Sequence, residues 1–473
     1  MKTTTPKCAA VVLLAIICAA WSAPAAADFE KATDHFLKGE YTESLRELQP
    51  LVEAGDPAAM NVMGVLLANG YGVTKDLRAA AEYYRKSAEK GHPKGQYNWA
   101  TTLKDGAAVA RDERTAAEWF RRSADQGNAG AQRELGLLYS IGSGLAEDRV
   151  QAIAWLRRAA DQGDAEAQYW VGRSFAEGYG SAKDQALAAG WFKKSAEQGF
   201  VDAQRKLGIM LFDGSGIKMD QQLGVQWLRR AAEQGDALAQ LTMGEAYSFG
   251  YGVDEDQREA ARWYRIAADQ GYAPALNNLG GLYERGAGGV RQDYAEAARL
   301  YEAAARQGNS YGQFNLARMY REGLGVPSDA VVAYGWTILA AAAESPHPKA
   351  VDERDAMVQY MPKNLIAEGQ RLAREWKPGT SLGKSKLKPV DGAPLAAAWA
   401  VKVGKAVDSQ PAGQQIGQYP ARPEAKPGLT TCNTKCVNGD CYRTYGDGRK
   451  VHFQARQKWN PFNNQFEWES GTC

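Results

Sequence analysis

Evenly spaced aspartates are the residues of this sequence that most readily suggest chemistry. Seven of them recur at intervals of 36 or 37 residues: Asp76, Asp112, Asp148, Asp184, Asp220, Asp256 and Asp293. Paired carboxylates act as general acid and general base when their surroundings separate their pKa values. Here, however, each aspartate stands just before a helical pattern, where its oxygen can accept a hydrogen bond from an unpaired backbone N–H. We therefore expect helix caps rather than catalytic carboxylates.

Histidines, which commonly serve as metal ligands and catalytic bases, are scarce in this chain. The four of them are scattered along the sequence: His35, His92, His347 and His452. A scattered set offers little for a metal cluster or for the activation of a nucleophile. The sequence therefore predicts no catalytic residue, no metal site and no cofactor.

The first 27 residues have the composition of an export signal. Lys2 and Lys7 precede an uncharged apolar run, which ends in the small residues 23–27. The apolar run is shorter than the roughly 20 residues that a membrane span needs, and no later segment is long enough either. We expect cleavage after Ala27 and a periplasmic or secreted protein without a transmembrane segment. Ile17 before Cys18 argues against lipidation, which requires a small residue there.

Charge gives little support to nucleic-acid binding. The signal carries two positive charges and no negative ones, so its removal lowers the formal net charge from +2 to 0. Acidic and basic residues are interspersed through the first three hundred residues, whereas nucleic-acid-binding domains usually show a basic patch. The sequence therefore predicts that nucleic acid is not a partner.

Cysteines gather at the C-terminal end of the chain. Those beyond the signal all lie in the last 42 residues: Cys432, Cys436, Cys441 and Cys473. In an exported protein this cluster predicts two disulfides, which would stabilise a domain too small to bury enough apolar surface alone. All three pairings stay open. A four-cysteine zinc site is the rival interpretation, and the gaps between the first three cysteines disfavour it.

An internal repeat organises most of the remaining sequence. Glycines recur every 36 residues and then once after 37: Gly55, Gly91, Gly127, Gly163, Gly199, Gly235, Gly271 and Gly308. A fixed period of this length is the signature of a repeat architecture. Each unit reads as helix, turn, helix, turn, and eight units fill residues 56–344. The sequence thus predicts an all-α solenoid.

Glycines and aromatic residues within each unit have predictable positions. The turn after the first helix contains glycine pairs, for example Gly142 with Gly144, where left-handed backbone angles are needed. A glycine inside the first helix, for example Gly136, predicts a close helix crossing. The second helix carries an apolar stripe, for example Leu223, Trp227 and Leu228, which we expect in the core.

These residues resemble the Sel-like repeat (SLR) subfamily of tetratricopeptide repeats. One unit carries the whole pattern: Ala131, Leu135, Gly136, Tyr139, Gly142, Gly144, Asp148, Trp155, Ala159, Ala160, Gln162 and Gly163. The second unit departs from it, with Ala100 in place of the mid-helix glycine and residues 105–108 in place of the glycine turn. The resemblance implies a right-handed α/α superhelix whose first helices line a concave groove, and a role in protein–protein interaction.

The groove positions are those on the side of the first helix opposite to the second helix. They vary from unit to unit, as in a heterogeneous binding surface. The candidates are Tyr97, Asn98, Glu134, Tyr169, Trp170, Arg173, Lys206, Asn278, Phe314, Asn315 and Arg318. Among them Tyr97, Trp170 and Phe314 stand out, because an aromatic ring directed to solvent suggests binding. Packing against the neighbouring unit is the alternative explanation.

The segments outside the array complete the predicted organisation. Residues 28–55 form an N-terminal capping helix pair, and residues 345–376 form C-terminal capping helices that shield the end of the stack. Residues 377–428 are rich in Pro, Gly, Ala, Ser and Lys and are predicted to be a flexible linker. Residues 429–473 are predicted to form a small disulfide-stapled, mostly β domain.

Three functions remain open at this level. The favoured one is a non-enzymatic adaptor of the bacterial cell envelope that binds a peptide or protein segment in the groove. The alternative is binding of peptidoglycan or another envelope glycan through the C-terminal domain. The third and least favoured is binding or hydrolysis of beta-lactams, which the resemblance raises because some cysteine-rich SLR relatives are linked to them. Two segments match Ser-x-x-Lys, Ser87 with Lys90 and Ser381 with Lys384, but without the accompanying motifs.

Overall fold

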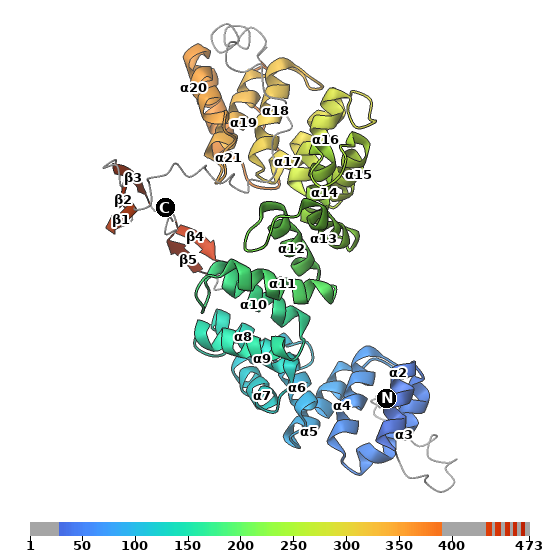
Figure 1. Cartoon of the computed structure of the whole chain (residues 1–473). Coiled ribbons are helices and arrows are strands. Elements are labelled where there is room, and N and C mark those ends of the chain that lie inside the picture. The colour runs from blue at the N-terminus through green and yellow to red at the C-terminus, as the bar shows by residue number, and fades with distance from the viewer. Residues whose placement is uncertain are drawn as a thin grey trace, which may run out of the picture. The chain divides into compact units, whose positions relative to one another are not determined.

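The structure is a computed structural model of the chain (Figure 1). It describes residues 28–389 and, further on, the backbone of five strands. The predicted signal and part of the predicted linker therefore lie outside the described residues. The side chains of residues 429–473, including the predicted disulfides, also lie outside them.

Residues 28–389 fold into helices alone. These are α2 (Phe29–Lys38), α3 (Tyr41–Glu53), α4 (Pro57–Asn69), α5 (Leu77–Glu89), α6 (Pro93–Asp105), α7 (Glu113–Asp125), α8 (Ala129–Ile141), α9 (Arg149–Asp161), α10 (Ala165–Glu177), α11 (Gln185–Glu197), α12 (Val201–Asp213), α13 (Gln221–Glu233), α14 (Ala237–Phe249), α15 (Gln257–Asp269), α16 (Ala273–Arg285), α17 (Tyr294–Arg306), α18 (Ser310–Glu322), α19 (Ala330–Ala342), α20 (Ala350–Tyr360) and α21 (Lys363–Glu375). The predicted all-helical solenoid is confirmed, and the handedness of its superhelix stays a prediction.

The regular aspartates cap the second helices, as predicted. In α9, for example, the carboxylate of Asp148 accepts hydrogen bonds from the backbone N–H groups of Val150 and Gln151, both at 3.0 Å. The same arrangement begins the other second helices (α5, α7, α11, α13, α15 and α17). These hydrogen bonds satisfy backbone donors that have no partner within the helix.

Glycine pairs end the first helices in left-handed geometry, also as predicted. Gly142 and Gly144 after α8 have φ angles of 68° and 69°. A Cβ on Gly144 would lie 2.1 Å from the carbonyl oxygen of Glu113 in the preceding repeat. The turn can therefore pack on the preceding repeat only because it has no side chain there.

Mid-helix glycines allow close approach of the two helices of a repeat. A Cβ on Gly244 in α14 would lie 2.5 Å from the Tyr264 ring of α15, and one on Gly136 in α8 would lie 2.7 Å from Leu156 Cγ of α9. Both ring and leucine are buried. This close crossing compensates for the poor helix propensity of glycine.

The second helices supply most of the core. Trp227, Leu228 and Ala231 of α13 are buried, as the apolar stripe predicts. Leu223 is a correction, because it lies in the first turn of α13 and is 38% exposed. The predicted stripe therefore begins one helical turn too early, because the core buries Trp227 and Leu228 but not Leu223.

The helices fall into two compact units, and the boundary lies between Ala182 and Lys183. In the first unit, α2 to α10, each helix packs mainly on its neighbours along the chain, for example α9 on α8 and α10. In the second unit, α11 to α21, the array ends in α19, which packs on both α20 and α21. No helix in the described residues is long and apolar enough to cross a membrane.

The beginning of the predicted linker is ordered, which corrects the prediction for residues 377–389. The side chains of Leu382 and Leu387 pack into the cluster that α19 and α21 form. The backbone N–H of Gly379 donates to the carbonyl oxygen of Arg306, and the N–H of Lys386 donates to Oε1 of Glu368 at 2.5 Å. A segment of low apolar content is held because its two leucines have a core to enter.

Five strands follow near the C-terminus. They are β1 (Cys432–Val437), β2 (Asp440–Tyr445), β3 (Lys450–Gln454), β4 (Gln457–Asn460) and β5 (Gln465–Trp468). The first three form an antiparallel sheet in the order β1-β2-β3, in which Cys436 lies opposite Cys441. The last two form an antiparallel pair.

Candidate functional site

The predicted groove residues of the first unit mostly connect neighbouring repeats. The side-chain amide of Asn98 in α6 donates to Asn61 of α4 at 2.7 Å. The ammonium of Lys104 in α6 lies 2.7 Å from the carboxylate of Glu134 in α8. Tyr97 is half-buried and packs edge-on against Phe120, with ring centroids 5.8 Å apart. Asn98 and Glu134 therefore join neighbouring repeats, whereas Tyr97 packs on Phe120 of its own repeat.

In the second compact unit (α11 to α21), the same positions of the first helices form polar contacts between repeats. Asn315 of α18 donates to Asn277 of α16 at 2.8 Å, and Asn277 in turn donates to Asn278 at 3.3 Å. Arg318 of α18 lies 2.6 Å from Glu284 of α16. Burial alone would raise the pKa of the Glu284 carboxyl, but the hydrogen bond and charge of Arg318, with the Tyr301 hydroxyl and the charge of Arg285, together lower it. Lys206 is half-buried on α12.

Two aromatic candidates do not face solvent. Phe314 is 8% exposed and stacks on the imidazole of His347, with ring centroids 3.7 Å apart. The prediction that this ring points to solvent is wrong, because the segment after α19 folds back over it. Tyr169 in α10 is 7% exposed and packs edge-on against Trp170, with centroids 5.5 Å apart. Neither ring offers a surface of its own to a partner.

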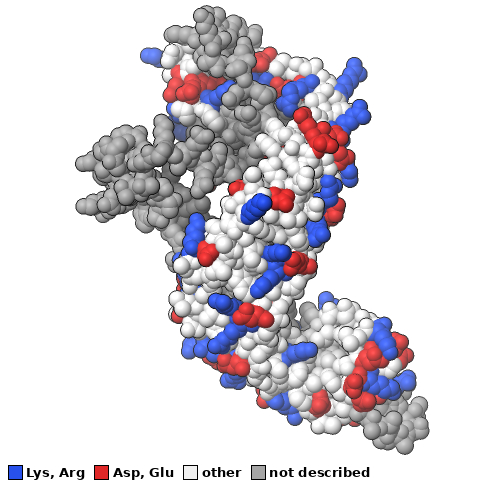
Figure 2. All heavy atoms as spheres, viewed as in Figure 1, with Lys and Arg blue, Asp and Glu red and all other residues white. Residues whose placement is uncertain are grey.

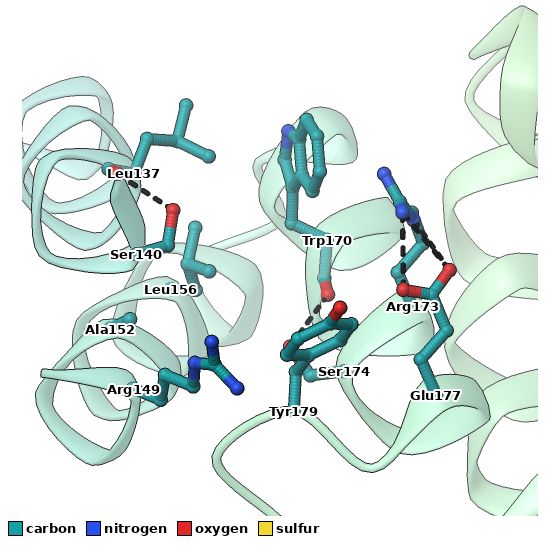
Figure 3. A pocket seen from close by; sticks show the side chains of 10 residues that line it. All are labelled: Leu137, Ser140, Arg149, Ala152, Leu156, Trp170, Arg173, Ser174, Glu177 and Tyr179. Atoms are coloured by element: carbon teal, nitrogen blue, oxygen red, sulfur yellow. Dashed lines mark hydrogen bonds and ion pairs between the residues drawn. The ribbon is translucent and has the colours of Figure 1, made fainter. Parts of the chain in front are cut away.

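Trp170 and Arg173 have a different setting, because both line a pocket between α8, α9 and α10 (Figure 3). The residues around it are Leu137, Ser140, Arg149, Ala152, Leu156, Trp170, Arg173, Ser174, Glu177 and Tyr179. In Figure 3, Leu137 and Leu156 stand on one side of the hollow, with Trp170 across from them. The pocket thus brings together residues from three helices and from the turn after α10.

Charged groups of this pocket lie over aromatic rings. The guanidinium of Arg173 lies 5.0 Å from the centroid of the Trp170 ring, and that of Arg149 lies 5.0 Å from the Tyr179 ring. Arg173 also donates from Nε and Nη2 to Glu177, at 3.1 Å and 3.0 Å. Such cation–π contacts hold the guanidinium groups in place beside an apolar wall.

The preceding repeat explains why the pocket is open at this place. Ser140 and Trp170 lie 36 residues after Lys104 and Glu134, whose ion pair joins α6 to α8. At the next step of the array a serine replaces the long lysine side chain and an indole replaces the carboxylate. No ion pair can therefore form there, and the space between the repeats stays hollow.

Eight of the ten residues that line the pocket were not among the predicted groove residues, which include only Trp170 and Arg173 here. Leu156 comes from the second helix α9, and Tyr179 comes from the glycine turn. A comparison of each unit with its predecessor could have found the site, because Ser140 is the small residue at a position where the unit before has a lysine.

The Ser-x-x-Lys serines have structural roles. The Ser87 hydroxyl donates to the carbonyl oxygen of Pro57 at 2.6 Å, and Ser123, 36 residues later, donates to Pro93 in the same way at 2.7 Å. Ser381 donates to the carboxylate of Glu302 at 2.5 Å. The first serine is a repeat feature, and the second helps to attach the ordered segment 377–389.

Acidic and basic side chains are mixed on the face of the molecule that Figure 2 draws, and basic ones do not gather into a patch there. Opposite charges also pair along single helices, for example Arg85 with Glu82 and Glu89.

The Sel1 repeat family matches the chain in eight consecutive segments, which contain the helix pairs from α4–α5 to α18–α19. They are residues 57–92, 93–128, 129–164, 165–200, 201–236, 237–272, 273–309 and 310–345. The chain belongs to the Sel1 repeat family. A stack of helix pairs of this kind is in general a scaffold for protein–protein interaction.

Two solved structures are similar to parts of this chain, and the first of them has the same fold. A protective antigen present in uropathogenic Escherichia coli strains, described as displaying an SLR fold, is 23% identical, with a TM-score of 0.50. The similarity covers 77% of this chain and 99% of that one. A Sel1 repeat protein from Oxalobacter formigenes is 27% identical over 51% of this chain and 97% of its own, with a TM-score of 0.47. A comparison with curated proteins found no match.

Proposed function

We propose that this Sel1 repeat protein is a non-enzymatic scaffold that binds a segment of a partner protein in the pocket between α8, α9 and α10. The observation that carries the proposal is the pocket itself, with apolar walls and with Trp170 and Arg173 along one side. Tryptophan and arginine dominate the binding energy of protein interfaces, particularly where they line a recess that excludes water.

The rest of the first-helix face supports one binding site rather than a continuous groove. Asn98, Glu134, Asn315 and Arg318 make hydrogen bonds or ion pairs to adjacent repeats, and Phe314 is buried. A partner would have to replace those internal contacts, at a cost in unpaired polar groups. At the pocket a partner side chain can enter without breaking the array.

We also propose that the protein works in the cell envelope as an adaptor. This part rests on residues 1–27 alone, whose charged start, apolar run and small residues are typical of an export signal. Glycan or cell-wall binding through residues 429–473 stays the alternative prediction, since the side chains that would carry it lie outside the described residues. The same holds for disulfides between the four cysteines.

Affinity purification from envelope extracts tests the binding proposal. Replacing both Trp170 and Arg173 with alanine should reduce recovery of the partner by at least about 30-fold, because hot-spot residues contribute about 2 kcal/mol or more each. A matched control is the double alanine variant of Trp119 and Arg122, whose guanidinium lies 4.4 Å from the indole on the second helix α7. This control removes the same two types of side chain from α7, which belongs to the same compact unit (α2 to α10) but does not line the pocket.

The control separates binding from folding. If the control retains the partner and the pocket variant loses it, the pocket is the contact site. Equal recovery with both variants would contradict the proposal.

A further inference from the structure

The chemistry of the pocket specifies what kind of segment it accepts. We infer that the pocket binds a peptide segment in which an apolar side chain lies within two residues of an aspartate or glutamate. This inference rests on the proposed function and adds the identity of the recognised residues. Three features of the pocket lead to it.

The first feature is the apolar interior. Leu137 and Leu156 face the Trp170 ring across the hollow (Figure 3), and Ala152 is buried behind them. None of these groups can hydrogen-bond to a ligand except the indole N–H, and that N–H lies 3.4 Å from the carboxylate of Glu166. A polar side chain entering here would lose its hydrogen bonds to water without replacement, whereas an apolar one gains from burial.

The second feature is the charge at the edge of the interior. The two cations among the ten lining residues are Arg149 and Arg173, and each is paired with one carboxylate, Arg149 with Glu147 and Arg173 with Glu177. Each guanidinium has five N–H donors in a planar fork that matches a carboxylate. A ligand carboxylate can therefore join Glu177 and Glu147 as a partner of these two arginines.

The third feature is the stacking that fixes the two arginines. Each guanidinium lies over an aromatic ring at 5.0 Å, Arg149 over Tyr179 and Arg173 over Trp170. A cation that is already ordered loses less conformational entropy on binding than a mobile one. A lysine or arginine in the ligand would instead find the carboxylates of Glu147 and Glu177 already paired with these arginines.

The spacing follows from the size of the site. Trp170 and Arg173 lie one helical turn apart on α10, and Arg149 begins α9. Because the Arg173 guanidinium lies 5.0 Å from the centroid of the Trp170 ring, an apolar side chain against that ring and a carboxylate on Arg173 can come from ligand residues one or two positions apart. A free carboxylate without an apolar neighbour would leave the interior empty, so both parts are required.

Selection from a random heptapeptide library displayed on phage tests this inference on the full-length protein. The comparison variant is Ser140→Lys with Trp170→Glu, which installs in the pocket the residues that occupy the same positions in the preceding repeat. Because the pair Lys104–Glu134 is accommodated there, this variant should keep the helices, which circular dichroism would verify.

We expect the enriched peptides to contain Leu, Met or Phe within two residues of Asp or Glu, and to be lost with the comparison variant. For one such synthetic peptide, calorimetry should show at least tenfold weaker binding when its acids become amides. A similar loss is expected when Arg149 and Arg173 of the protein both become glutamine, a second variant that leaves the apolar interior intact.

The other outcomes each contradict a defined part. Peptides that depend on the pocket but show no preference for acids, or contain basic residues, would overturn this inference and leave the proposed function standing. Peptides that bind the wild type and the comparison variant equally, or no enrichment at all, would overturn the proposed function together with the inference.

Discussion

Replacing Gly244 with alanine tests whether the mid-helix glycines exist for close helix crossing. On an exposed helix this change stabilises by about 1 kcal/mol, because alanine loses less conformational entropy than glycine. At position 244 the new Cβ would lie 2.5 Å from two atoms of the Tyr264 ring, which is buried and cannot move away. Overpacking of this kind costs about 1–3 kcal/mol. We expect a net loss of up to about 2 kcal/mol.

Gly190 is the matched control for this change. It also lies inside a helix, α11 of the same unit, but it is exposed and a Cβ there would have no neighbour within 4 Å. Alanine at position 190 should therefore stabilise its helix by up to about 1 kcal/mol. The same substitution is expected to act with opposite sign at the two positions.

Native-state hydrogen exchange is the suitable assay, because a solenoid unfolds in segments and a single unfolding free energy is not defined. The amides of α14 and α15 should exchange up to about 30 times faster with alanine at position 244, as a loss of up to about 2 kcal/mol implies. The amides of α11 should exchange up to about fivefold more slowly with alanine at position 190. Slower exchange in both variants would refute the crossing argument, since helix propensity would then outweigh the contact with Tyr264.

Three further predictions concern the C-terminal end of the array. Burial, followed by the charge of Lys349, lowers the pKa of His347 to about 4, so the folded protein binds this proton less readily than the unfolded chain. The contribution of His347 to the free energy of unfolding is therefore fully present above about pH 6.5 and is lost as the pH falls toward 4. With phenylalanine at position 347, the free energy of opening measured by hydrogen exchange should change less across this range. Glu353→Ala removes the partner of the buried Arg321 in α20, although Glu322 remains beside it, and should cost about 3 kcal/mol, measured as faster hydrogen exchange in α18 and α20. Changing both residues of the pair, to Leu and Met, should recover much of this loss. In a chain that ends at residue 376, the amides of α19 and α21 should exchange at least about fivefold faster than in one that ends at 389, because the contacts of the partly buried Leu382 and Leu387 are lost; equal exchange would show that the segment contributes nothing.

Features set by local chemistry were predictable from the sequence. A cap such as Asp148 and a turn such as Gly142 with Gly144 depend on residues only a few positions away. Because the same residue pattern occurs in eight repeats, the helix pairs are predictable even where one repeat departs from the pattern. Fold and family follow from these local features.

Features set by contacts between distant residues were not predictable. Phe314 is buried because His347, from the segment after α19, stacks on it. The segment 377–389 has the composition of a linker, but Leu382 and Leu387 enter a core that three other elements form. Period and composition do not contain that information.

The pocket lies between these two cases. Trp170 and Arg173 were among the predicted groove residues, since their positions on the first helix are set by the repeat. The hollow beside them depends on Ser140 and on the residues of α9 and of the turn after α10, so it arises only when the repeats are packed together. The sequence therefore predicted two residues of the α10 wall, Trp170 and Arg173, but not the residues of the other walls.

Photocrosslinking in living cells tests the central claim most directly. A benzophenone amino acid in place of Trp170 should form a covalent adduct with a partner protein on irradiation, because it keeps an aromatic group at the wall of the pocket. The same amino acid in place of Trp119, on the second helix α7, should form none with that partner. Adducts from both positions alike, or from position 119 alone, would contradict the proposal that the pocket between α8, α9 and α10 is where this protein binds its partner.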